Sequence, residues 1–165
     1  SKYAGELYVQ QNASRHLICR AGWMMGAGPN KDKKFIQKIM SQIKGGSKEL
    51  FVVNDKLGTP TYTHDFAANV QLLLEKELWG LYNVVCGGIT GRLEVAEELV
   101  RLLNLNDLIK VTSVDSSHFQ KEYYADRPPS ERLLDTKLNL RGVNIMRDWK
   151  LCLQEYIQNY YHDYL

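Results

Sequence analysis

The 165-residue sequence predicts an α/β fold, because helical patterns alternate along it with short apolar runs that are typical of buried strands. Apolar residues recur at helical spacing in five segments, residues 2–12, 35–43, 66–78, 93–103 and 147–161. Short apolar runs occupy residues 16–20, 50–53 and 80–88, and residues 109–114 alternate apolar with polar side chains, which predicts a half-exposed strand. In sheets built from such units, ligands bind beyond the carboxyl ends of the strands. A ligand-binding site is therefore expected in the turns that follow the strands.

The opening helix and strand lead directly to one of these turns. Residues 2–12 are expected to form an amphipathic helix, and residues 16–20 a buried strand. Trp23 then stands in a turn rich in small residues, at the ligand end of that strand. The breaker cluster at residues 26–30 predicts a loop.

Capping residues define the later helices. Gly45 and Gly46 are expected to end the helix over residues 35–43. Thr61 or Thr63 is the expected N-cap of the helix that follows, and Thr90 that of the next one. Residues 115–134 then form a long polar loop, and loops of such length in a compact domain tend to be functional.

Composition and charge exclude several classes of protein. With 44% hydrophobic and 24% charged residues, the chain has the composition of an ordinary globular protein, and no apolar run reaches the length of a membrane span. A net charge of +2 argues against a nucleic-acid polymer as partner. The three scattered cysteines predict reduced thiols and a cytoplasmic location. The four histidines show no ligand spacing, so no metal is predicted.

Three short motifs resemble a known enzyme family. These are Ser-Lys-Tyr-Ala-Gly-Glu at residues 1–6, Arg-x-x-Trp at residues 20–23, and Gly-Thr-Pro-Thr at residues 58–61. A looser match is Asp-Arg-Pro at residues 126–128 with the polar segment that follows. Together they are similar to the dTDP-4-dehydrorhamnose reductases, which are extended short-chain dehydrogenases. The similarity runs through nearly all of the chain in one order.

The resemblance implies the C-terminal portion of a Rossmann-like NAD(P)-binding fold with its substrate-binding lobe. Residues 1–30 and 51–88 would lie mainly on the nucleotide-binding sheet side, and residues 31–50 and 89–165 mainly in the substrate lobe. No Gly-x-Gly-x-x-Gly motif is present, and the family's catalytic tyrosine would stand two places before Ser1. The chain by itself is therefore expected to be inactive, and the cofactor, NADPH or NADH, to be bound mostly by the missing N-terminal half.

The resemblance also implies roles for residues. Lys2 matches the lysine of the family's Tyr-x-x-x-Lys pair, so it is the expected catalytic residue and a contact to the cofactor ribose. Ala21 falls at a cofactor-side position where the family commonly has a hydroxyl residue. Trp23 would line the sugar pocket, and Thr59 and Pro60 would border the substrate.

Arg127 would bind the diphosphate of a nucleotide sugar, since a guanidinium makes bidentate contacts to phosphate. Plainer interpretations stand beside these roles. Lys2 could pair with Glu6 one helical turn on, Trp23 could be a core residue, and Arg127 could hold its own loop. Lysines 31, 33 and 34 could face a phosphate or form a solvated surface.

The function that these expectations favour is NADPH-dependent reduction of dTDP-4-dehydro-L-rhamnose, the step that yields dTDP-L-rhamnose. The substrate would be a nucleotide sugar, and a homodimer is compatible with the sequence. One alternative is a non-catalytic regulatory subunit with the same fold, such as the relative that regulates methionine adenosyltransferase. Another is a different nucleotide-sugar dehydrogenase, epimerase or dehydratase.

Overall fold

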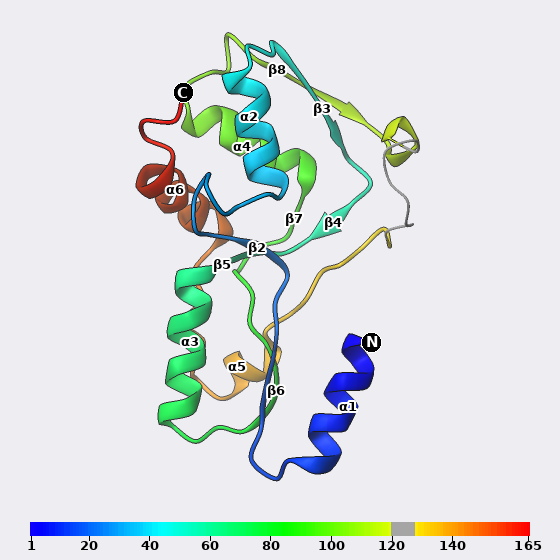
Figure 1. Cartoon of the computed structure of the whole chain (residues 1–165), viewed down its shortest axis with the longest axis vertical. Helices are drawn as coiled ribbons and strands as arrows, with labels where there is room; N and C mark the ends of the chain where they lie inside the picture. The colour runs from blue at the N-terminus through cyan, green and yellow to red at the C-terminus, as the bar shows by residue number, and fades with distance from the viewer. Residues whose placement is uncertain (120–127) are drawn as a thin grey trace.

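A computed structural model describes residues 1–119 and 128–165 and confirms the α/β class. The molecule is elongated, with one group of elements around β1 and β6 and another around β3 and β8 (Figure 1). In chain order the elements are α1 (Lys2–Asn12), β1 (Leu17–Arg20), β2 (Trp23–Met25), α2 (Phe35–Lys44), β3 (Glu49–Val53), β4 (Leu57–Gly58), β5 (Pro60–Tyr62), α3 (Thr63–Glu75), β6 (Gly80–Asn83), β7 (Thr90–Gly91), α4 (Arg92–Leu102), β8 (Lys110–Val114), the 3-10 helix η1 (Ser116–Phe119), α5 (Thr136–Leu140) and α6 (Trp149–Tyr160).

The strands pair between segments that are distant in the sequence. Three pairs are parallel, β1 with β6, β2 with β5, and β3 with β8, whereas β4 and β7 are antiparallel. In the β2–β5 pair, Trp23 lies opposite Pro60. This pair crosses the middle of the molecule, between the two groups of elements (Figure 1).

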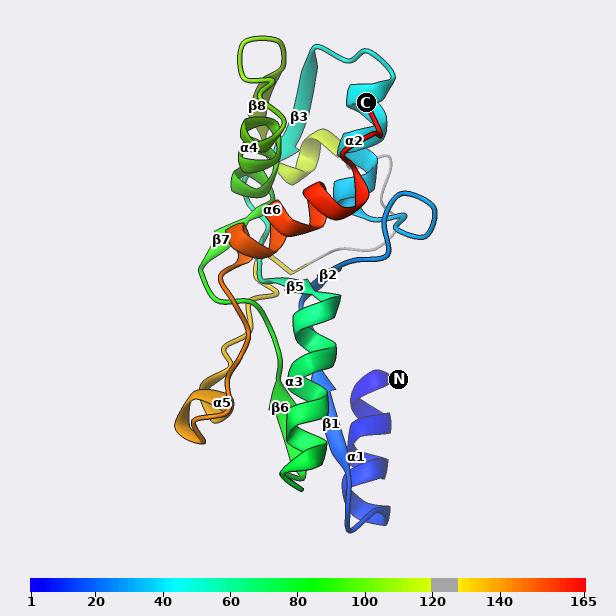
Figure 2. The ribbon, with the colours of Figure 1, turned by 90° about the vertical axis from the view of Figure 1, so that its left-hand side faces the viewer.

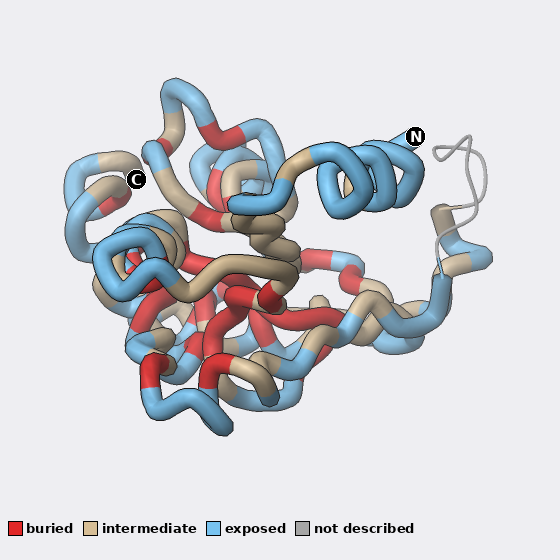
Figure 3. The backbone as a smooth tube through the Cα atoms, turned by 90° about the horizontal axis from the view of Figure 1, so that it is seen from below, coloured by how far each residue is buried: buried red, intermediate tan, exposed pale blue. Residues whose placement is uncertain are grey.

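The first group packs α3 and the short α5 against the β1–β6 pair (Figure 2). Its small core combines Leu73 of α3, Tyr82 of β6, and Leu138 of α5, each fully buried. Figure 1 shows α1 on the other side of the strand pair from α3. None of the α1 side chains is buried, and the helix stands out as an exposed coil in Figure 3.

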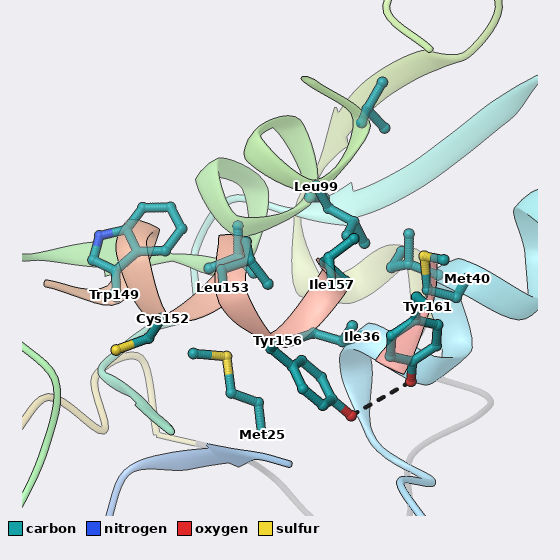
Figure 4. Close-up of a cluster of buried hydrophobic side chains, with 14 of the residues drawn as sticks. Met25, Ile36, Met40, Leu99, Trp149, Cys152, Leu153, Tyr156, Ile157 and Tyr161 are labelled. Carbon is teal, nitrogen blue, oxygen red and sulfur yellow. Dashed lines mark hydrogen bonds between the residues drawn. The ribbon is translucent and has the colours of Figure 1, made fainter. Parts of the chain in front are cut away.

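The second group encloses the larger core. Helices α2, α4 and α6 pack against β3 and β8. Helix α6 contributes Trp149, Leu153 and Ile157, which face α4 and α2 (Figure 4). The apolar stripe expected over residues 147–161 is therefore the buried face of α6, and it packs into the core with residues of α2 and α4.

Several local expectations are wrong. Trp23 lies in the strand β2 rather than in a turn. The side chains of β1 are half-buried rather than buried. The reason is that, among the described residues, β1 pairs only with β6, and α1 covers little of it. The N-caps are Tyr62 and Gly91, not the threonines. Thr61 instead accepts a hydrogen bond from the Gly22 backbone at 3.0 Å, which joins β5 to the start of β2.

The described helices are all too short or too polar to cross a membrane.

Candidate functional site

A cavity of about 830 Å³ opens in the second group of elements. Its walls come from β2, from residues 32–42 around the start of α2, from β3, and from the first turn of α4. η1 and Glu131 contribute from the long polar segment, and α6 forms part of the floor. The volume lies within the range of ligand pockets, roughly 300–1,000 Å³.

The charge of the cavity wall is strongly positive. Among the described residues, five cationic side chains line it, and so do two carboxylates, Asp32 and Glu131. The cations are Lys33, Lys34, Lys38, Lys56 and Arg92. The described residues of the wall therefore carry more positive than negative charge, although the whole chain has a net charge of only +2. A concave surface lined by one sign of charge attracts ligands of the other sign, here anions.

Trp23 is fixed in the wall by contacts on several sides. Its backbone N–H donates to the Thr59 carbonyl at 2.8 Å, and its indole Nε1 donates to Oε2 of Glu131 at 2.8 Å. Gly58 lies against the six-membered ring, where a Cβ would come within 2.1 Å of the Trp23 Cε2 atom. A glycine is therefore required at position 58 for the ring to occupy this place.

The ring of Trp23 also contacts the guanidinium group of Arg92. The guanidinium carbon of Arg92 lies 4.6 Å from the centroid of the indole and 5.1 Å from that of Phe35. Distances of this size are those of cation–π contacts, which stabilise by about 0.5–2 kcal/mol. The indole thus supports an arginine as well as lining the cavity. Sequence reasoning missed Arg92, because no motif marks it.

Thr59 and Pro60 have different surroundings. Pro60 lines the cavity. Thr59 is buried, and its hydroxyl accepts a hydrogen bond from the Leu133 backbone at 3.2 Å. Leu57 pairs with residue 130 in the same region, so the loop around Thr59 holds the segment that brings Glu131 to the cavity.

Lys2 and Ala21 do not line the cavity. Lys2 is exposed at the start of α1, and Ala21 is half-buried just beyond β1; neither is among the described residues of the wall. Glu6 pairs with Arg20 of β1, with Nε–Oε1 at 2.9 Å, and this hydrogen bond lowers the pKa of Glu6. Arg127 lies outside the described residues. Of the three lysines at residues 31–34 considered for phosphate, Lys33 and Lys34 line the cavity.

A polar cluster outside the cavity wall connects α3 to the start of α6. Asp65 of α3 accepts hydrogen bonds from Arg147, at 2.9 Å from Nε and 2.6 Å from Nη2, and from the thiol of Cys152 at 3.3 Å. Burial would raise the pKa of Asp65, but the bonds from Arg147 and Cys152 outweigh it and lower that pKa. The neighbouring thiol of Cys86 and burial both raise the pKa of Cys152.

No cluster of three or more histidine, cysteine or acidic side chains in the described ranges is arranged to hold a metal ion.

The resemblance inferred from the sequence is confirmed by comparison with known proteins. The RmlD substrate binding domain matches residues 1–162. A dTDP-4-dehydrorhamnose reductase of Shigella flexneri is 29% identical over 160 residues, which are 92% of this chain and 52% of that protein. The spore coat polysaccharide biosynthesis protein SpsK of Bacillus subtilis is 28% identical over 158 residues, 96% of this chain and 52% of that protein.

Solved structures agree with this result. The dTDP-4-dehydrorhamnose reductase of Yersinia enterocolitica superposes with a TM-score of 0.86 at 32% identity, over 96% of this chain and 55% of that one. The Bacillus anthracis reductase, solved in complex with NADP, gives a TM-score of 0.85 at 26% identity over 96% of this chain and 53% of the other. The chain spans about half the length of the curated relatives that it matches.

Proposed function

Because this chain belongs to the RmlD substrate binding domain family, we propose that the protein carrying it is an NADPH- or NADH-dependent reductase of dTDP-4-dehydro-L-rhamnose. The observation that carries the proposal is the basic cavity with Trp23 in its wall. A nucleotide sugar combines a diphosphate with an apolar sugar face, and a cavity with five cations and an indole suits both parts.

The chain would supply the substrate side of the reaction. The group of elements around β3 and β8 would hold the nucleotide sugar, and the group around β1 and β6 would belong to the sheet that binds the cofactor. Thr59 and Pro60 would border the substrate, Arg127 would contact its diphosphate, and Ala21 would face the cofactor. The relatives are about twice as long as the chain, and we propose that this half does not turn over alone.

Lys2 would assist the proton transfer to the substrate rather than bind the sugar. A bound nicotinamide supplies the hydride, and the carbonyl oxygen of the substrate must gain a proton. In the family's Tyr-x-x-x-Lys pair, the tyrosine would donate this proton. A phenol has a pKa of about 10, and an ammonium group close to it, here that of Lys2, favours the phenolate and lowers the pKa of the phenol. The exposure of Lys2 at the start of α1 leaves its side chain accessible to such a partner.

The test is oxidation of NADPH by the full-length protein in the presence of dTDP-4-dehydro-L-rhamnose, followed at 340 nm. The variant Lys2→Met should lower the rate by about 100-fold or more, the range of general acid–base catalysis. Lys76→Met removes the same charge from an exposed site at the end of α3 and should leave the rate unchanged.

Absence of oxidation by the wild-type protein would contradict the reductase proposal. If that protein still bound the nucleotide sugar, the non-catalytic binding subunit would be favoured instead. If Lys2→Met and Lys76→Met lower the rate equally, the proposed role of Lys2 is refuted.

A further inference from the structure

Arg92 occupies the point of the cavity wall where three elements meet. It is the first residue of α4, Trp23 begins β2, and Phe35 begins α2. Its guanidinium carbon lies 4.6 Å from one ring centroid and 5.1 Å from the other. Arg92 is distant in the sequence from both Trp23 and Phe35, so the fold assembles an arginine with two aromatic supports at a single place.

Contact with two rings has a consequence for ligand binding. A guanidinium is planar, and its five N–H donors point outward in that plane. The two rings attract the cation and restrict its position. A cation held in this way loses little side-chain entropy when it binds an anion, and its planar fork matches two phosphate oxygens.

The other charges of the wall favour the same ligand. Lys33 and Lys34 lie beside Phe35, and Lys56 lies one residue before the strand that contains Gly58. Glu131 also lines the cavity, and one of its oxygens accepts the hydrogen bond from Trp23 that orients the indole. A diphosphate is the part of a nucleotide sugar that requires several cations together.

We propose that Arg92 binds a phosphoryl group of the nucleotide sugar, with the rings of Trp23 and Phe35 holding its guanidinium in position. This assignment rests on the proposed function and adds a specificity-determining residue to it. Arg92 would discriminate nucleoside diphosphates from nucleosides, because a nucleoside has no phosphate oxygens that could accept hydrogen bonds from the guanidinium.

The experiment compares ligands with and without phosphate on the full-length protein. Dissociation constants for thymidine, thymidine diphosphate and NADPH are measured by calorimetry for the wild type and for Arg92→Ala, Arg92→Lys and Arg101→Ala. Arg101 is the matched control, because it lies on the same helix, is exposed, and pairs with Glu98 at 2.7 Å. Near-ultraviolet circular dichroism checks that each variant is folded.

Arg92→Ala should weaken binding of thymidine diphosphate by about 10- to 100-fold, the range of hydrogen bonds to a charged group. Binding of thymidine and NADPH should stay unchanged. Arg92→Lys keeps the charge but not the fork and should still lose about 10-fold for the diphosphate, a figure of the same origin. Arg101→Ala should bind all three ligands like the wild type.

The assignment is overturned if Arg92→Ala weakens thymidine and its diphosphate equally, since Arg92 would then only support Trp23. It is also overturned if Arg92→Lys binds the diphosphate like the wild type, or if NADPH is the ligand that is lost. In these cases wild-type binding of thymidine diphosphate leaves the reductase proposal intact. A wild-type protein that binds neither the diphosphate nor NADPH would refute both.

Discussion

The ion pair between Asp65 and Arg147 should be a major support of the contact between α3 and α6. Asp65 is 8% exposed and accepts from the Nε and Nη2 atoms of Arg147, from its backbone N–H at 3.2 Å, and from the Cys152 thiol. Replacing Asp65 by asparagine keeps the shape of the side chain. It removes the charge and turns an NH₂ group towards the donors.

The cost follows from the bonds that are lost. A hydrogen bond to a charged group contributes about 1.5–3 kcal/mol, and breaking a buried ion pair costs about 3–5 kcal/mol. The Arg147 side chain is 42% exposed, so water replaces part of what it loses. With this screening, Asp65→Asn should lower the free energy of unfolding by about 2 kcal/mol.

The pH dependence of this difference has a definite sign. The pKa of Asp65 is lowered in the folded protein, so the ion pair contributes its full stability above the unfolded-state pKa of about 3.9. The contribution decreases as the pH falls below that value and is lost below the folded-state pKa. The difference between wild type and Asp65→Asn should therefore be constant from pH 7 to about pH 5 and shrink at lower pH.

Urea unfolding followed by circular dichroism measures both effects. The control is Glu77→Gln, because Glu77 pairs with Arg15 while both side chains are about two-thirds exposed. That variant should lose less than about 0.5 kcal/mol. An Asp65→Asn loss no larger than that of Glu77→Gln, or one that grows as the pH falls from 5 to 3.5, would refute the reasoning.

Two further substitutions test the larger core. Leu153→Ala should cost about 2–5 kcal/mol in urea unfolding, since Leu153 is fully buried, whereas Leu151→Ala on the exposed side of α6 should stay within about 0.5 kcal/mol. Equal losses would contradict the placement of α6. Tyr156→Phe should cost about 1–3 kcal/mol by the same measurement, because the hydroxyl donates to the buried carboxylate of Asp32 at 2.9 Å. A loss below that of Tyr160→Phe, whose hydroxyl contacts His64 at the surface, would contradict this.

The long elements were predictable from the sequence because each buries one face. The segments 35–43 and 147–161 carry regular apolar stripes, and the structure has α2 and α6 there. The strand over residues 109–114 was predicted to be half-exposed, and the side chains of β8 are all exposed or half-buried.

The short strands were not predictable in the same way. β2, β4, β5 and β7 have two or three residues each, too few for a periodicity, and they exist because they pair with distant segments. The five-residue α5 was missed for a related reason, since only Leu138 in it is buried. Trp23 was expected in a turn, but it begins the three-residue strand β2.

The cavity shows the same limit of sequence reasoning. Trp23 and Pro60 were identified through the family motifs, and both lie in its wall. Arg92 follows a glycine and begins an ordinary helix, so nothing in the sequence links it to Trp23. That link arises only when α2, β2 and α4 converge in three dimensions.

The exposed first helix bears on where Lys2 can be. An isolated helix of 11 residues is only marginally stable in water, and α1 has no buried side chain of its own. The pair formed by Glu6 and Arg20 fastens the helix to the neighbouring strand near its middle. Tyr3 and Tyr8 meanwhile present large apolar surfaces to solvent. The position of α1, and with it that of Lys2, therefore depends largely on this one ion pair.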